Sequence, residues 1–173
     1  MSKSPSVLVA VGANETPKLP RQNYEPRVHT IYNMPVGAGN TTPEDYNFFN
    51  GVIQSDTIDG EIPNIYGFLK GNHSYSSPSS LKEIVGLFEL DPHVEIVTTD
   101  LLVKKISIDT EFIEYSHSEA INDCAFFVKS SLIDHVKFES NPEIFKGVLD
   151  SLVRQGKKIY HIAEPLLTAE FNE

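Results

Sequence analysis

Several polar residues of the sequence stand just after apolar runs, where they could do chemistry. Asp100 follows the run 94–98, and its carboxylate could act as a general base or as a ligand. Lys70 follows the run 62–69 and offers a cation at the end of a predicted strand. The other residues at or near such ends are Asn14, Asn33, Asn72 and His73. Because ligands of α/β sheets bind beyond the carboxyl ends of the strands, these positions are the candidates for a binding site.

Each candidate also has an ordinary structural interpretation. Aspartates at strand ends often cap turns, which would account for Asp100 without any chemistry. Lysines in loops are mostly solvated, which would account for Lys70. Glu143 falls in the first turn of a predicted helix, where a carboxylate complements the helix dipole. The residues alone leave both interpretations open.

The elements that must position these residues alternate between strands and helices in the first hundred residues. The continuous apolar run at 7–11 is typical of a strand buried on both faces. Helical spacing of apolar residues, with capping residues before it, predicts helices at about 42–55, 80–90 and 142–155. Prolines at 17, 20 and 26 make 14–27 a surface loop. The remaining predicted strands are 28–32, 62–69, 94–98, 124–128 and 157–162, with a β-hairpin at 101–115.

This order predicts a single compact α/β domain over residues 1–173. We expect an α/β/α sandwich around a mixed, mainly parallel central sheet. A chain of 173 residues is long enough to bury a core without disulfides or a structural metal.

Charge and composition exclude several classes of protein. The net charge is −10, which argues against general nucleic-acid binding and against docking on anionic lipid. No apolar run approaches the ~20 residues that span a bilayer, and the N-terminal residues lack a signal-peptide core. The single cysteine excludes an internal disulfide. We therefore expect a soluble, acidic, cytoplasmic protein.

Two further kinds of site receive no support. Cys124 lies beside Asp123 and near His117, but it begins a predicted buried strand, where a thiol behaves as a small hydrophobe. The histidines at 29, 73, 93, 117, 135 and 161 contain no pair at helical His-x-x-x-His spacing, so no zinc site is predicted.

Five segments of the chain resemble a known family. Residues 68–81 are similar to the strand, loop and helix around the Asp-x-Asp motif of family-two glycosyltransferases, which have the GT-A fold, and 89–100 resemble the helix end and strand that follow. Residues 9–14 resemble the family's first strand and turn, 50–53 its next helix, and 152–166 its closing helix and strand. The resemblance covers most of the chain in order and is strongest in structural segments.

The resemblance implies a role for each candidate residue. Asn14 and Asn33 would contact the nucleotide of a nucleotide sugar, and Asn33 stands where the family has an acid that contacts uracil. Lys70, Asn72 and His73 stand at the Asp-x-Asp motif and would contact the diphosphate. Asp100 or Glu143 would act as the catalytic base, with Glu143 about one residue from the family's register.

In the family, the Asp-x-Asp motif holds a divalent cation, Mn²⁺ or Mg²⁺, against the diphosphate. A lysine at the first position would repel a metal and could itself supply the positive charge, so the site would be metal-independent and no metal ligand is predicted.

Two functions of different classes follow. The first is transfer of a sugar from a nucleotide-sugar donor. The second is a catalytically inactive protein of the same fold that serves as a binding, assembly or structural module, with a protein partner or a homo-oligomer. An enzyme would need Lys70 and Asp100, whereas a module would instead expose an apolar patch of several hundred Å².

Overall fold

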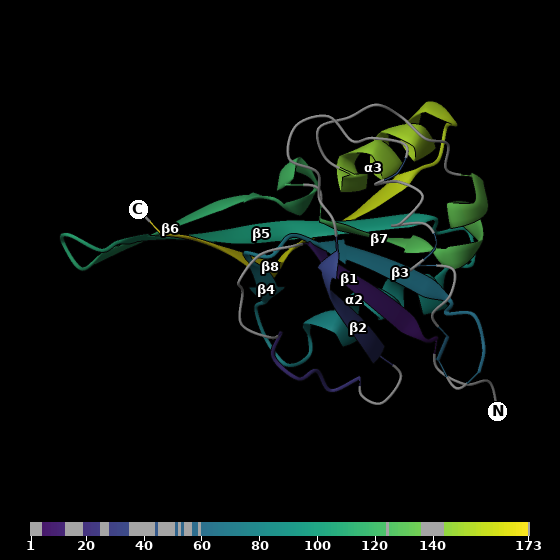
Figure 1. The fold of residues 1–173 in the computed structure, drawn as a ribbon, viewed down its shortest axis with the longest axis horizontal. Coiled ribbons are helices and arrows are strands. Elements are labelled where there is room, and N and C mark those ends of the chain that lie inside the picture. The colour runs from purple at the N-terminus through teal and green to yellow at the C-terminus, as the bar shows by residue number, and fades with distance from the viewer. Residues whose placement is uncertain are drawn as a thin grey trace.

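The computed structural model describes residues 5–12, 19–24, 28–34, 44, 51, 53, 57–58, 60–123, 125–135 and 144–172. Over these residues the protein is a mixed α/β structure with one curled, strand-rich sheet (Figure 1). Asn14, Cys124, Glu143, most of the predicted helix at 42–55 and much of the loop at 14–27 lie outside them. The strands are β1 (Val7–Gly12), β2 (Val28–Met34), β3 (Ile65–Leu69), β4 (His73–Tyr75), β5 (Ile96–Ser107), β6 (Phe112–Glu119), β7 (Phe126–Lys129) and β8 (Ile159–Asn172).

The sheet has the order β2-β1-β3-β7-β5-β8-β4, and β6 pairs with β5 beyond the end of its pairing with β7. The pairings β1–β2, β1–β3 and β5–β8 are parallel. The pairings β3–β7, β5–β7, β5–β6 and β4–β8 are antiparallel. The prediction of a mixed sheet is confirmed, but among the described strands the sheet is not mainly parallel. The short strands β4 and β7 and the hairpin strand β6 supply the antiparallel pairings.

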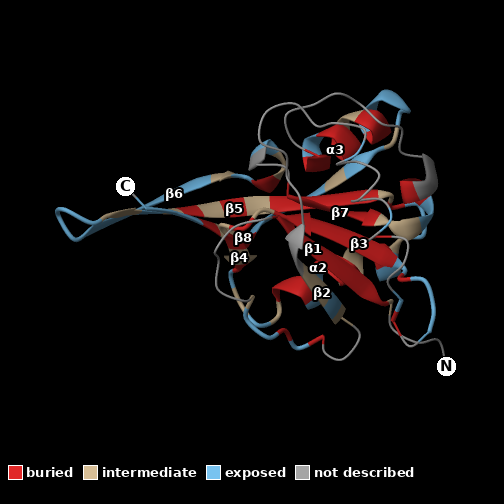
Figure 2. Cartoon of the chain, viewed as in Figure 1, coloured by how far each residue is buried: buried red, intermediate tan, exposed pale blue. Residues whose placement is uncertain are grey.

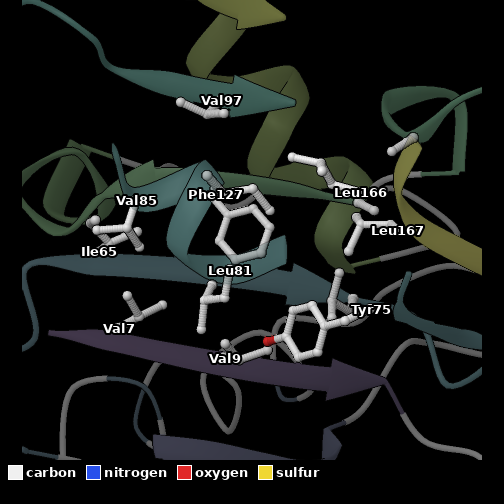
Figure 3. Packing of buried hydrophobic residues seen from close by; sticks show 14 of the residues in the cluster. Val7, Val9, Ile65, Tyr75, Leu81, Val85, Val97, Phe127, Leu166 and Leu167 are labelled. Atoms are coloured by element: carbon white, nitrogen blue, oxygen red, sulfur yellow. The ribbon is translucent and has the colours of Figure 1, made fainter. Parts of the chain in front are cut away.

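Two helices with described bounds lie on opposite faces of this sheet, α2 (Ser80–Leu90) and α3 (Ile144–Arg154) (Figure 1). Alternate residues of β1 face them, because successive side chains of a strand point to opposite sides. Val7 and Val9 belong to the apolar cluster that includes α2, and part of this cluster is drawn in Figure 3. Leu8 and Ala10 belong to the cluster that includes α3. The continuous apolar run therefore reflects burial on both faces, as predicted.

The predicted apolar face of α2 is buried, and the start of this helix is held by a residue of the proline-rich loop. The Leu81 amide donates to Gln22 Oε1 at 3.0 Å, and Gln22 Nε2 donates to the Ser77 carbonyl at 3.1 Å. Gln22 thereby satisfies one of the amides that a helix start leaves without a partner. At the end of α3, Gly156 has φ of +80°, which is the predicted left-handed cap.

Three phenylalanines join the sheet to α3. The ring centroid of Phe68 in β3 lies 5.0 Å from that of Phe126 in β7 and 5.1 Å from that of Phe145 in α3. On the other face, Phe127 packs directly over Gly67, its partner in the ladder, where a Cβ atom would collide with the ring. The absence of a side chain at Gly67 thus makes room for an aromatic ring.

β5, β6 and β8 continue beyond the body of the protein as a projecting arm, which is mostly exposed at its end (Figure 2). The hairpin predicted at 101–115 is confirmed, with Ser107 pairing Phe112 next to the turn. β8 is much longer than the predicted strand at 157–162, and its second half runs alongside β5 to Asn172. Pro165, which suggests an end to the strand, lies instead where the register between the two strands shifts.

No helix among the described residues is long and apolar enough to cross a membrane.

Candidate functional site

The carboxyl ends of several strands meet at one edge of the sheet. β3 and β5 each run antiparallel to β7, so they run parallel to each other, and β1 is parallel to β3. Phe127 pairs with both Gly67 and Val97, and Val9 pairs with Gly67, so these residues form one row across the sheet. Gly12, Lys70 and Asp100 each stand three residues beyond this row.

Lys70 and Asp100 therefore both lie beyond this row, after strands that β7 separates within it. At Asp100 itself the neighbour on that side of β5 is Glu119 of β6. Asn33 lies at this edge too, since its neighbour Met34 pairs with Gly12. The structure thus brings Asn33, Lys70 and Asp100 to one edge, where the sequence predicts a site. Asn14 and Glu143 lie outside the described residues.

Lys70 begins a tight turn that His73 closes. The His73 amide donates to the Lys70 carbonyl at 3.0 Å, and the Lys70 amide donates to His73 Nδ1 at 2.9 Å. Accepting this bond places the proton of the neutral imidazole on Nε2. The Asn72 carbonyl accepts from the Glu170 amide at 3.0 Å, which fixes the turn against β8. His73 is buried and shapes the turn, whereas Lys70 and Asn72 are partly exposed.

Asp100 lies between two histidines from the strands on either side. Its Oδ1 is 2.6 Å from Nε2 of His161 in β8, and its Oδ2 is 2.8 Å from Nε2 of His117 in β6. Thr98, Asp100 and Leu102 share one face of β5 because they alternate along the strand. His161 pairs with Thr98 and His117 pairs with Leu102, so both imidazoles reach Asp100 diagonally on that face.

The register shift between β5 and β8 falls at Asp100. Thr99 pairs with Ile162 and Leu101 pairs with Leu167, so Asp100 alone faces residues 163–166 of β8. Irregularities of this kind redirect side chains and occur often beside functional sites.

The two histidines hold the Asp100 carboxylate in its charged form. The hydrogen bonds from His117 and His161 lower the pKa of Asp100 below its ordinary value of 3.8, with partial desolvation opposing them. Since an ionised carboxylate only accepts hydrogen bonds, the proton of each neutral imidazole lies on Nε2 and leaves Nδ1 as a proton acceptor. Asp100 itself is a weak base in this arrangement.

Access to solvent differs between His117 and Asp100. The His117 side chain is 59% exposed, whereas that of Asp100 is 15% exposed. No other described residue makes a hydrogen bond to the His117 ring. A half-buried carboxylate that orients an exposed imidazole is an arrangement suited to general base catalysis.

Sequence reasoning did not find His117 and His161 as site residues. Their contact with Asp100 depends on the register of β6 and β8 against β5, which their spacing in the sequence does not reveal. The signal available in the sequence was the predicted hairpin: a turn near 108–111 places residue 117 opposite residue 102 on the partner strand.

The described residues contain no group of three or more His, Cys, Asp or Glu side chains arranged to hold a metal ion. The two imidazoles of the cluster face different oxygens of Asp100 rather than a common point. A cavity of about 390 Å³ lies at the opposite edge of the sheet, lined by residues that include Asn64, Lys129 and Ser130. The Lys129 ammonium there donates to the Pro92 carbonyl.

Comparison of the chain with known families finds no family model that matches, and a search of curated proteins finds no match.

Proposed function

We propose that the protein binds a nucleotide sugar at the edge formed by Asn33, the 70–73 turn and Asp100, and transfers its sugar to an acceptor hydroxyl. The observation that carries this proposal is the meeting of a lysine-bearing turn and an Asp-His cluster at the carboxyl ends of parallel strands. The resemblance of 68–81 to the Asp-x-Asp region of GT-A glycosyltransferases supports the choice of substrate class. The finer GT-A architecture, an α/β/α sandwich, is part of the same proposal.

In this reaction His117 acts as the general base. The acceptor oxygen attacks the anomeric carbon while its proton passes to Nδ1 of His117. The bond from the anomeric carbon to the phosphate oxygen breaks, and the nucleoside diphosphate leaves. Asp100 positions the imidazole and stabilises its charged form, as the carboxylate of other Asp-His pairs does.

Lys70 would face the negative charge that develops on the leaving diphosphate. A fixed cation at this point acts in place of a metal ion. Asn33 would remain a contact of the nucleotide, and we assign the same role to Asn14 by resemblance alone. Glu143 remains a second candidate base, also by resemblance alone.

The second candidate is a protein of this fold that binds or assembles without turnover. The observation in its favour is the arm, where Phe112, Ile113 and Tyr115 are exposed near the end of the sheet (Figure 2). Under this alternative, substitution of His117 or Asp100 changes no reaction rate because there is none.

The first prediction concerns donor binding. Thermal unfolding in the presence of nucleoside diphosphates and nucleotide sugars, each with and without Mn²⁺, tests it. A ligand at 100 times its dissociation constant stabilises the folded state by about 2.7 kcal/mol, which raises the midpoint by roughly 5–10 °C for a chain of this size. We expect such a shift with at least one nucleotide, unchanged by Mn²⁺.

The matched pair of variants for this measurement is Lys70→Ala and Lys82→Ala. Lys82 is an exposed lysine of α2, outside the 70–73 turn. Lys70→Ala should abolish most of the shift, and Lys82→Ala should keep it. A shift that survives Lys70→Ala unchanged, or the lack of any shift across the panel, contradicts the proposal.

A further inference from the structure

The outer strand of the arm is a long strand that has one neighbour among the described strands. β6 spans eight residues, and among the described strands it pairs with β5 alone. Almost every residue of β6 is exposed. A free edge presents a row of backbone donors and acceptors, and proteins usually protect such edges with charged side chains, lysine above all, with proline or with a bulge. β6 contains no lysine or proline, its acidic residues are Glu114 and Glu119, and its pairing with β5 has no irregularity.

Large apolar side chains lie on both faces of this edge. Phe112 is 60%, Tyr115 58% and Ile113 46% exposed. With about 200 Å² for a large apolar side chain, these three leave on the order of 300 Å² of apolar surface open on one molecule. Two such surfaces in contact would bury about 600 Å² of apolar surface, less than the ~1,000 Å² of a stable interface, so the contact is a weak one that also relies on backbone hydrogen bonds between the paired strands.

We propose that β6 pairs antiparallel with β6 of a second copy of this chain, around a twofold axis through Tyr115. The two sheets then form one continuous sheet across the dimer. This inference does not depend on the proposed reaction, because the arm would form the same contact in an inactive protein.

The sequence of β6 is compatible with this pairing. With the axis at Tyr115, the aromatic rings of the two copies face each other, and cross-strand aromatic pairs stabilise sheets. Ile113 of each copy then faces His117 of the other, and Glu114 faces Ser116, so no two carboxylates within β6 lie opposite each other, although Glu119 at the end of the strand faces Glu111 of the turn. An axis at Glu114 would place like charges together, and destabilise the pair. An isologous contact of this kind closes on itself and stops at two copies.

The pairing must overcome the repulsion between two chains that each carry a net charge of −10. Because salt screens charges that are exposed and far apart, we expect the dimer to tighten as ionic strength rises. Sedimentation velocity of the full chain at 1–200 μM (roughly the range of weak dimers), in low and in high salt, measures this directly.

The variant that tests the edge is Tyr115→Lys, with Thr110→Lys as its control. Both add one positive charge to the arm, but Thr110 lies in the turn, outside the paired strand. Tyr115→Lys should remain monomeric over a concentration range in which wild type and Thr110→Lys form dimers, a weakening of at least about tenfold for a lost aromatic pair and an edge lysine. A wild-type chain that stays monomeric at every salt concentration overturns the proposal, as does a dimer that persists in Tyr115→Lys.

A cysteine placed on the axis tests the register. In a Cys124→Ala background, Tyr115→Cys should be cross-linked efficiently by a short bismaleimide, because residues at the axis face each other at about 5 Å. Phe112→Cys should not, since it lies far from its own copy in this register. Equal cross-linking of the two variants contradicts the axis at Tyr115.

Discussion

Replacing His117 by alanine is expected to lower the rate of sugar transfer by about 10²–10⁴-fold, the usual effect of losing a general base. The imidazole is exposed, and its Nε2 is held by Asp100 Oδ2 at 2.8 Å, so its loss removes the proton acceptor without opening the core. The measurement is the release of nucleoside diphosphate, with the nucleotide sugar that stabilises the protein best as donor. We expect kcat to fall and KM for the donor to change little, because the proposed role of His117 is to accept the proton of the acceptor hydroxyl.

The matched control is His93→Ala. His93 is also exposed, and the hydrogen bond at this position comes from its backbone amide to Asp91 Oδ1, which alanine keeps. Asp100→Asn should resemble His117→Ala, since an amide cannot hold both imidazoles as a carboxylate does. If His117→Ala transfers sugar at the wild-type rate, the imidazole is not the base.

Replacing Phe68 by alanine is expected to lower the free energy of unfolding by about 3–5 kcal/mol. Phe68 is fully buried and joins β3 to β7 and α3 through its contacts with Phe126 and Phe145. Its loss leaves a cavity between the sheet and the helix. The expected loss of stability is a large fraction of the 5–15 kcal/mol by which a typical domain is stable. Urea denaturation followed by circular dichroism measures the change.

Phe112→Ala is the control for this prediction when it is studied at a concentration too low for self-association. The same ring is lost, but from an exposed position on the arm, so we expect a change within about 0.5 kcal/mol. Equal destabilisation by the two substitutions would show that the Phe68 cluster does not hold α3 to the sheet.

Local patterns predicted much of the fold. The apolar run at 7–11, the apolar stripe of α2 and the glycine after α3 each act within a few residues, and each is confirmed, whereas the N-cap Ser79 of α2 makes no side-chain capping hydrogen bond. Pairing direction depends on contacts between distant segments, which is why the sheet has more antiparallel pairings than predicted. The second half of β8 was missed because it pairs with the long strand β5, which is a contact between distant segments.

The candidate site was predicted in part, for the same reason. Parallel strands bring their carboxyl ends to one edge, so Lys70 and Asp100 could be placed together from the order of the elements. The two histidines of the Asp100 cluster come from β6 and β8, and their approach depends on register. Residue types near strand ends thus indicated where the proposed site lies, but not which side chain we would propose as the base.

The location of nucleotide binding tests the central claim most directly. Titration of the isotope-labelled protein with the nucleotide that raises the unfolding midpoint most, followed by changes in the amide NMR spectrum, gives this location. We predict that the largest changes fall on the 70–73 turn and around Asp100, His117 and His161. Changes centred instead on Asn64 and Ser130, beside the cavity at the opposite edge, would contradict the assignment of the site.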